Sequence, residues 1–326
     1  MTLRYVLSKL IKNPTAVIGL VLLLGFIILA VGAPQFAPVP ENSRDPFMIP
    51  RDGFRSEPQG PSEDHIMGTT EGQYDIWYGV VWGSRTAFRI GIVITLFTTL
   101  IGVLIGSISA YFGGWIDEVL MRITEIFQAF PFLLTAITLT SVLQAVYGRG
   151  DQGFTIWTAK ILAFLTFGHS LFEDINPIQL SIITGMIAII IFGWMTIARV
   201  TRGNILAVKN FEYALAARTI GARDSRILFR HLLPNAIFPV LVIASMNIGS
   251  YVLTFAALSF LGLGAQVGYA DWGQMISFAR NWISSLADYS HIIMYPGTVI
   301  LLFVLSWNLV GDALRDILDP RLRGSN

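Results

Sequence analysis

The sequence predicts an all-α, polytopic membrane protein with about six transmembrane helices, and three observations support this fold class. Of its 326 residues, 54% are hydrophobic and 13% are charged, and the mean hydropathy of +0.63 is far above that of an ordinary soluble domain. Several uncharged segments reach the roughly 20 residues that a helix needs to cross a bilayer. Lys and Arg concentrate in alternate loops between these segments, as in multi-pass membrane proteins.

Six segments are long and apolar enough to be transmembrane helices. In chain order they are residues 14–33, 87–112, 123–146, 180–198, 236–263 and 291–310. The first segment is longer than the apolar core of a signal peptide, so we interpret it as a span. A shorter stretch, 156–171, is interrupted by Lys160 and His169, and we interpret it as a re-entrant or interfacial helix, with a seventh span as the alternative.

Two of the spans carry residues that predict how they pack or bend. Gly102 and Gly106 form a GxxxG pattern in the second span, which indicates close approach of another helix. Pro131 lies inside the third span and removes an internal hydrogen bond, so it predicts a kink or an unwound turn there.

Polar and aromatic residues near the span ends favour interfacial positions. Arg85 and Arg89 are expected to reach toward lipid headgroups, with contact to a substrate carboxylate as the weaker alternative. Four tryptophans are expected to form an aromatic belt at the membrane interface. They are Trp77, Trp82, Trp272 and Trp282.

The distribution of Lys and Arg predicts a multi-pass membrane protein with both termini in the cytoplasm. Four regions follow from this orientation. They are residues 1–33 (cytoplasmic N-terminus and first span), 34–84 (extracytoplasmic loop), 85–314 (core with five spans, an extended outer loop near 148–177 and a cytoplasmic coupling loop at 203–234) and 315–326 (cytoplasmic tail).

Several classes of function are disfavoured by the sequence. None of its four lysines is followed by the Ser or Thr of a phosphate-binding loop, so the chain lacks a nucleotide-binding motif. No cysteine is present, and His169 with Glu173 is only a weak metal pattern. The net charge of +1 gives no reason to expect nucleic-acid binding. We predict no catalytic, metal or cofactor-binding residue, and therefore no enzyme.

The stretch 212–235, between the fourth and fifth spans, carries four arginines. Asn210 is expected to cap a first helix that has Glu212 in its first turn and ends at Gly221 in a left-handed conformation. A second short helix is expected to end at Pro234. Three alanines, at 214, 216 and 217, leave one face of the first helix without bulk, so we predict that a cytoplasmic protein docks there rather than a lipid surface.

This stretch resembles the signature loop of the permeases of binding-protein-dependent ABC importers. The resembling residues are the pair Ala216-Ala217, then Gly221, and then Leu232-Leu233-Pro234. Other segments resemble the C-type permeases of the dipeptide, oligopeptide and nickel branch. They are residues 198–203, SFLGLGAQ at 259–266, DWGQM at 271–275, YPG at 295–297 and GDALRDILDPRLR at 311–323.

The resemblance implies a location in the plasma (inner) membrane of a prokaryote, a set of partners and a role for the docking stretch. A second, homologous permease would complete the translocation pathway, two cytoplasmic ATPase subunits would bind ATP and Mg²⁺, and an extracytoplasmic binding protein would deliver peptides. The residues that would couple this chain to the ATPases are Glu212, Tyr213, Ala216, Ala217, Arg218, Gly221, Arg226, Leu233 and Pro234.

Other functions stay open at this point. The stretch GTTEGQYD at 68–75 differs from the GTDxxGRD usual in the family, and versions with Thr and Gln are similar to those of some sugar importers. Oligosaccharides or nickel chelates are therefore the alternative cargo. A carrier driven by ions without any ATPase, and a scaffold that only recruits a cytoplasmic protein, are the alternatives to an importer subunit.

Overall fold

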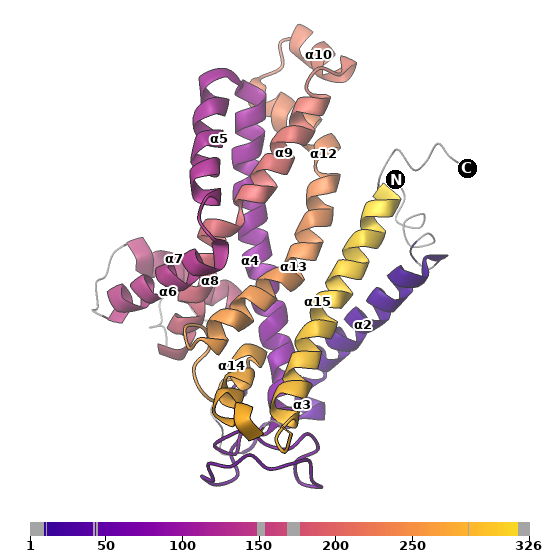
Figure 1. The fold of residues 1–326 in the computed structure, drawn as a ribbon. Helices are drawn as coiled ribbons and strands as arrows, with labels where there is room; N and C mark the ends of the chain where they lie inside the picture. Colours follow the sequence, from indigo (N-terminus) through magenta and orange to yellow (C-terminus); the bar gives the residue numbers. More distant parts are fainter. Residues whose placement is uncertain are drawn as a thin grey trace.

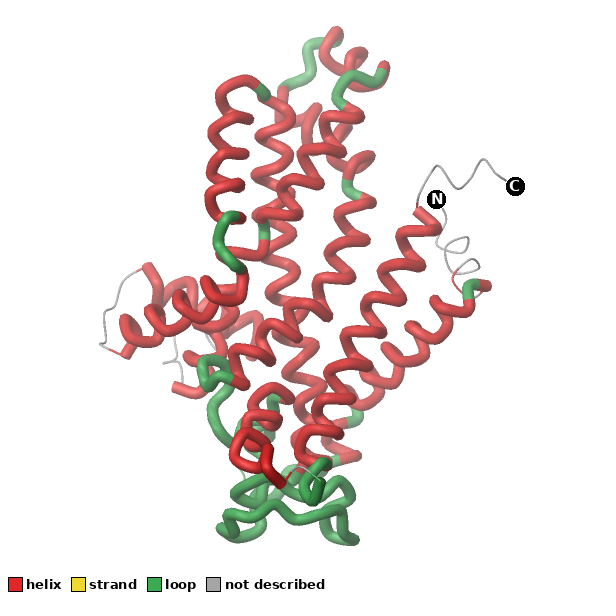
Figure 2. Tube along the Cα trace, viewed as in Figure 1, coloured by secondary structure: helices red, strands yellow, loops and turns green. Residues whose placement is uncertain are grey.

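The computed structural model describes residues 10, 12–41, 43, 45–148, 154–167, 177–285 and 287–318, and helices dominate this part of the chain (Figures 1 and 2). The first helices are α2 (Pro14–Val31), α3 (Ala33–Phe36), α4 (Ile76–Phe112), α5 (Gly114–Gln128), α6 (Phe132–Gly148), α7 (Phe154–Phe167), α8 (Pro177–Gly193) and α9 (Met195–Val208). They are followed by α10 (Glu212–Thr219), α11 (Asp224–Arg226), the π-helical turn η1 (Ile227–Leu232), α12 (Leu233–Ala236), α13 (Phe238–Phe260), α14 (Trp272–Ser277), the 3₁₀ turn η2 (Phe278–Ser285) and α15 (His291–Leu318).

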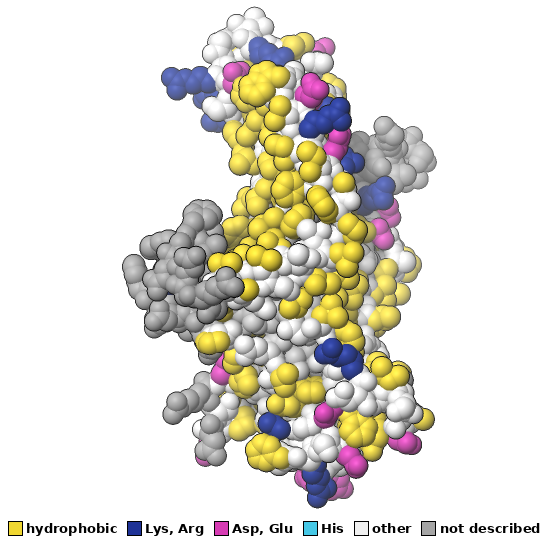
Figure 3. Space-filling view, turned by 60° about the vertical axis from the view of Figure 1, so that its left-hand side comes forward, with side chains coloured by type: hydrophobic (Ala, Val, Ile, Leu, Met, Phe, Trp, Pro, Cys, Tyr) yellow, Lys and Arg dark blue, Asp and Glu magenta, His cyan; other side chains and the backbone are white. Residues whose placement is uncertain are grey.

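The predicted all-helical membrane fold is confirmed. Within the described residues, five helical stretches are long and apolar enough to cross a membrane, and a sixth arises if the bent pair α5 and α6 counts as one span. The five are α2, α4, α8 with α9, α13 and α15. Helix α7 has 14 residues and is not one of them. Figure 3 shows a broad hydrophobic band on one face, with charged side chains mainly toward the two ends.

The third predicted span, 123–146, is interrupted where Pro131 stands. Helices α5 and α6 meet there at an angle of 87°, so the predicted break is confirmed, and the pair forms either one broken span or a re-entrant loop. Pro131 has no N–H to continue α5, and its carbonyl instead accepts the hydrogen bond of Thr135 N at 3.0 Å, which starts α6. The direction of the chain therefore changes sharply at Pro131.

Helix α4 is the centre of the bundle and packs on α2, α5, α8, α9, α13 and α15. It begins at Ile76, so the predicted loop 34–84 ends nine residues earlier than expected. The GxxxG prediction is confirmed. A methyl group on Gly106 would lie 2.2 Å from the carbonyl oxygen of Ala198, and one on Gly102 would lie 2.7 Å from Ile197, so only glycine permits this approach of α9.

One end of the bundle is covered by a loop cap, formed by residues 45–75 and 264–277 (at the bottom of Figure 1). Backbone bonds join its two parts, from Ile49 N to Gly268 O at 2.8 Å and from Ala270 N to Phe47 O at 2.7 Å. The ring of Phe47 stacks on that of Tyr269 with 5.6 Å between the ring centroids. The opposite end carries α10.

The predicted aromatic belt is wrong for two of its four tryptophans. Trp82 and Trp272 are each 2% exposed, and they donate their indole N–H groups to the carbonyls of Ala37 and Val80. A tryptophan can be buried inside a membrane protein when its single donor, the indole N–H, has a hydrogen-bond acceptor. These two residues fasten the ends of α4 and α14 rather than face the membrane interface.

Candidate functional site

The α10 tip, defined as residues 210–236, is the end of the molecule that the sequence predicts to dock a partner. Helix α10 starts after Phe211, whose backbone is extended and whose side chain makes no capping bond. The predicted cap at Asn210 is therefore wrong. Phe211 itself offers its carbonyl to Ala214 N at 2.9 Å, which closes the first turn without a polar side chain.

The end of α10 is the one that Gly221 predicts. Its φ of 77° lies in the left-handed region, where glycine has no steric penalty. The N–H of Gly221 donates to Arg218 O at 2.9 Å and that of Ala222 donates to Ala217 O at 3.1 Å, which are the two bonds of a Schellman motif. The chain thus reverses sharply and returns toward the membrane helices.

The small-residue face of α10 is used inside the chain. Ala214 is 0% exposed and Ala217 is 5% exposed, and both pack with Ile227, Leu228 and Leu232 of η1. The prediction that these alanines leave a bare face for a partner is wrong, because η1 folds back and covers it. Ala216 stays exposed. The face open to a partner carries Glu212, Tyr213, Leu215, Ala216, Arg218 and Ile220.

The second helix of the tip does not end at Pro234. The helical run continues through α12 to Ala236, with Pro234 near the start of α12, where its missing N–H is tolerated. Before it, η1 has the wider π-helical turn, with the N–H of Leu233 bonded to Leu228 O. Leu232 is fully buried and Leu233 half-buried, while Pro234 is exposed.

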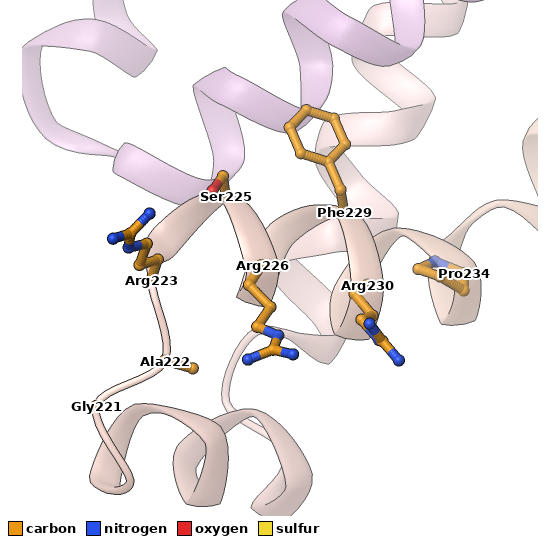
Figure 4. Close-up of a pocket in the computed structure, with 8 residues that line it drawn as sticks. All are labelled: Gly221, Ala222, Arg223, Ser225, Arg226, Phe229, Arg230 and Pro234. Carbon is orange, nitrogen blue, oxygen red and sulfur yellow. The ribbon is translucent and has the colours of Figure 1, made fainter.

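A groove with a volume of about 780 Å³ lies beside the Gly221 turn. Figure 4 shows Arg226 and Arg230 pointing to the same side of the helical turn that carries them, with Pro234 at one edge. The lining residues are Gly221, Ala222, Arg223, Ser225, Arg226, Phe229, Arg230 and Pro234. No ion pair joins these three arginines to a carboxylate of the described residues, so their N–H donors are available to carboxylates or carbonyls of a partner.

The exposed apolar side chains of the tip complete this surface. Ile220 is 84% exposed, and Phe211, Leu215 and Phe229 are exposed as well. Large apolar groups beside unpaired arginines are typical of protein interfaces, where Arg and aromatic residues are enriched. Of the nine predicted coupling residues, Gly221, Arg226 and Pro234 line the groove. Glu212, Tyr213, Ala216 and Arg218 lie on the open face of α10, and Ala217 and Leu233 pack behind it.

Sequence reasoning missed the contacts that join the tip, and Lys209 just before it, to the end of α4. Tyr111, at the end of α4, donates its hydroxyl to Asp224 Oδ1 at 2.5 Å, and Lys209 Nζ donates to Ala110 O at 2.9 Å. Desolvation by burial and the charge of Arg218 lower the pKa of Lys209. These partners lie about a hundred positions apart in the sequence, so no local pattern indicates them.

A second fastening joins α5 to α9 below the tip. Arg202 donates from Nε and Nη2 to the two carboxylate oxygens of Asp117, each at 2.6 Å, and Ser109 also donates to Asp117. Such a two-point contact fixes orientation as well as distance. The available signal was Asp117 in the first turn of α5 after two glycines, but nothing near it points to Arg202.

No candidate metal site accompanies this surface in the described ranges. No group of three His, Asp or Glu side chains there is arranged to hold a metal ion. The weak pair His169 and Glu173 lies outside the described residues.

Comparison with known families gives a match over most of the chain. The family described as "Binding-protein-dependent transport system inner membrane component" matches residues 102–324. The chain belongs to this family. The family described as "N-terminal TM domain of oligopeptide transport permease C" matches residues 2–54, which include α2.

Individual relatives agree with this assignment. The permease is 32% identical to the dipeptide transport system permease protein DppC of Alkalihalophilus pseudofirmus over 98% of this chain and 90% of that protein. It is 34% identical to the oligopeptide transport system permease protein OppC of Bacillus subtilis, over 96% and 87%. It is 35% identical to the glutathione transport system permease protein GsiD of Pectobacterium atrosepticum, over 81% and 75%.

A solved structure supports the fold alone. The permease is similar to a chain of the MetNI methionine ABC transporter in an inward-facing conformation, with a TM-score of 0.53 and 17% sequence identity. The similarity covers 74% of this chain and 97% of that chain. With the family match, the permease is the transmembrane component of an ABC importer, as the sequence predicts.

Proposed function

We propose that the permease takes up peptides as one of two homologous transmembrane chains of an importer. Two ATPase subunits bind ATP and Mg²⁺ and drive it through the α10 tip, and an extracytoplasmic binding protein delivers cargo to the loop cap. Both termini lie in the cytoplasm, because the basic residues concentrate on the side of the α10 tip.

The observation that carries this proposal is the unsatisfied surface of the α10 tip. Three arginines line its groove without a carboxylate partner in the described residues, and Ile220 extends an apolar side chain into solvent. A soluble subunit with acidic and apolar groups would satisfy both features at once. Movement of that subunit would then act on α9 and α13, the helices on either side of the tip.

Peptides are the cargo that the relatives favour. Two of the three relatives named above are named for dipeptide or oligopeptide transport, and none is named for a sugar or for nickel. Oligosaccharides, nickel chelates and ion-driven transport by this chain alone are therefore less well supported.

The docking proposal is tested by charge reversal within the groove. Arg226→Glu with Arg230→Glu should remove most of the ATPase that co-purifies with the tagged permease in mild detergent, because like charges then face each other. Arg55→Glu, an exposed arginine of the loop cap, is the matched control and should leave co-purification unchanged. Equal recovery of ATPase with the groove variant and the wild type would refute docking at the tip.

Cargo is tested separately in proteoliposomes that hold the full complex. ATP-dependent accumulation of a labelled dipeptide or oligopeptide is expected, with none in the absence of ATP. Uptake by the permease alone, without ATPase subunits, would contradict the importer proposal. ATP-dependent uptake of sugars but not peptides would contradict only the cargo.

A further inference from the structure

Arg89 lies in a helix that is long and apolar enough to cross the membrane, and no described residue supplies it with a hydrogen-bond acceptor. It lies on α4 and is half-buried, with its guanidinium carbon 4.5 Å from the centre of the Phe47 ring. It makes no hydrogen bond or ion pair with any residue that the structure describes. The charge of Asp45 acts on it, but from beyond ion-pair distance, and Asp45 Oδ1 accepts instead from Phe47 N at 2.9 Å.

Five N–H donors on a charged group at this depth need an acceptor. Ionisable groups that face a bilayer pair with another charge, with backbone carbonyls or with headgroups, because leaving them unsolvated in hydrocarbon is strongly unfavourable. The described part of the chain gives Arg89 the ring of Phe47 and longer-range electrostatic interactions with Tyr269 and Asp45, but no hydrogen-bond acceptor. An anion from outside the chain is the missing partner.

The neighbouring Arg85 shows at what depth this anion would bind. Its Nε donates to Ala30 O and its Nη2 donates to Val31 O at 3.1 Å, so it satisfies carbonyls at the end of α2. Helix α2 has 18 residues, which corresponds to about 27 Å, close to the thickness of the hydrocarbon core. Its end therefore marks the boundary between acyl chains and headgroups.

A cavity opens at this boundary between α2 and α4, with a volume of about 390 Å³. Arg85 and Arg89 supply its charge, and its other lining residues are apolar: Ile27, Ala30, Val31, Phe88 and Ile92. Exposed apolar side chains continue from it toward the membrane centre, with Leu24 on α2 and Leu96 on α4. Figure 1 shows α2 at the edge of the molecule.

We propose that this cavity binds an anionic phospholipid of the outer leaflet. Arg89 donates to the phosphate, Arg85 adds charge from its place at the end of α2, and the apolar walls hold the first part of an acyl chain. The leaflet rests on the orientation proposed above, whereas the site itself does not. A cargo carboxylate fits less well, because the polar part of the cavity is followed by an apolar strip rather than by further polar groups.

The site is tested by native mass spectrometry of the complex as purified, after delipidation. Dioleoyl phosphatidylglycerol and dioleoyl phosphatidylcholine are added in separate titrations. Wild type should retain the anionic lipid preferentially. Arg89→Gln should weaken phosphatidylglycerol binding about fivefold, the effect of one basic side chain near anionic lipid, and leave phosphatidylcholine binding unchanged. Arg280→Gln, an exposed arginine outside the cavity, should change neither lipid.

Several results would overturn the proposal. They are equal retention of both lipids by wild type, an Arg89→Gln variant that binds phosphatidylglycerol like wild type, and displacement of the lipid by millimolar inorganic phosphate, which would indicate a free-anion site. Loss of the second permease from Arg89→Gln preparations without any change in lipid binding would instead identify a protein contact. If Arg89→Gln does not fold, Arg89→Lys keeps the charge and should keep the preference.

The lipid measurement uses neither ATP nor cargo. Its failure would leave docking at the α10 tip untouched, and a failure of docking would leave the lipid result standing.

Discussion

The two ends of the permease differ in how completely each satisfies its own polar groups. In the loop cap, Gln73 is buried and donates to Glu57 O at 2.6 Å, and Asp271 caps α14 by accepting from Gln274 N at 2.8 Å. At the α10 tip, the groove arginines have no carboxylate partner among the described residues, and Ile220 is exposed. The side-chain amide of Gln274 is an exception in the cap, because its Nε2 and Oε1 are buried without a hydrogen-bond partner. The cap is therefore held mainly by contacts within the chain, whereas the tip carries the surface that we propose is completed by another protein.

The largest expected effect comes from overfilling the loop cap. A methyl group at Gly273 would lie 2.1 Å from the carbonyl oxygen of Ala256 and 2.4 Å from its Cα, both backbone atoms that cannot move aside. Gly273→Ala should therefore destabilise the permease by roughly 3 kcal/mol, the upper part of the range for overpacking. The measurement is the thermal unfolding midpoint in detergent.

The control for this variant is Gly60→Ala, in the same cap, where no atom lies within 4 Å of the added methyl group. It should leave the midpoint unchanged. A Gly273→Ala midpoint equal to that of wild type would break the comparison, because the cap would then be as adaptable as the tip.

An intermediate effect is expected below the tip, at the pair of Asp117 and Arg202. Its two charge-assisted bonds are partly exposed, so we expect a coupling free energy of about 1 to 2 kcal/mol from a double-mutant cycle of Asp117→Ala and Arg202→Ala. The thermal midpoints of the two single variants and the double variant supply the cycle. If the losses of stability in the two single variants add up to that of the double variant, the pair does not hold α5 to α9. The tip would then be less firmly attached to the bundle than the structure indicates.

The smallest expected effect is a pH dependence of the loop cap. His65 Nδ1 donates to Asp75 Oδ2 at 2.7 Å, and Nε2 lies 3.2 Å from Asp52 Oδ2. Desolvation by burial lowers the pKa of His65, but the hydrogen bond and charge of Asp75, with those of Asp52, outweigh it, so the pKa is raised above 6.5. Because the folded pKa is the higher one, the stabilisation is complete below about pH 6.5 and is lost as pH rises through the folded pKa.

This dependence is measured as the thermal midpoint of wild type and of His65→Gln between about pH 6 and about pH 8. Wild type should lose stability over this window and the variant should lose less. Burial also raises the pKa of Asp271 to about 6. Ionisation of this carboxyl therefore lowers the stability of the fold at lower pH, as pH rises from about 4 to about 6. Parallel curves for the two proteins above about pH 6 would show that His65 contributes nothing to the cap.

The sequence predicted the helical membrane fold because span length and charge are local properties of the chain. Gly221 and Pro131 were also predictable, since a left-handed helix end and a broken helix depend on one residue type each. The buried positions of Trp82 and Trp272 were not, because a tryptophan at a span end has the same local pattern whether it faces lipid or the bundle. Only tertiary contacts determine whether such a tryptophan faces lipid or the bundle.

The predicted coupling residues themselves remain a prediction, but the structure changes how two of them would act. Ala217 and Leu233 pack behind the surface, so they position α10 rather than touch a partner. The same limit explains why Tyr111 and Arg202 were missed. Their partners are distant in sequence, and a tyrosine at a helix end carries no sign of the carboxylate it will meet.

The direction in which the α10 tip points depends on the number of residues in the π-helical turn η1. A turn bonded from residue i to residue i+5 contains one residue more than α-helical bonding would use over the same stretch. Deleting one residue from η1 would restore α-helical bonding and rotate α10 relative to α13 by about 100°, the angle of one helical residue. The arginines would remain present and exposed but would face another direction, a loss that no scan of side-chain substitutions would reveal.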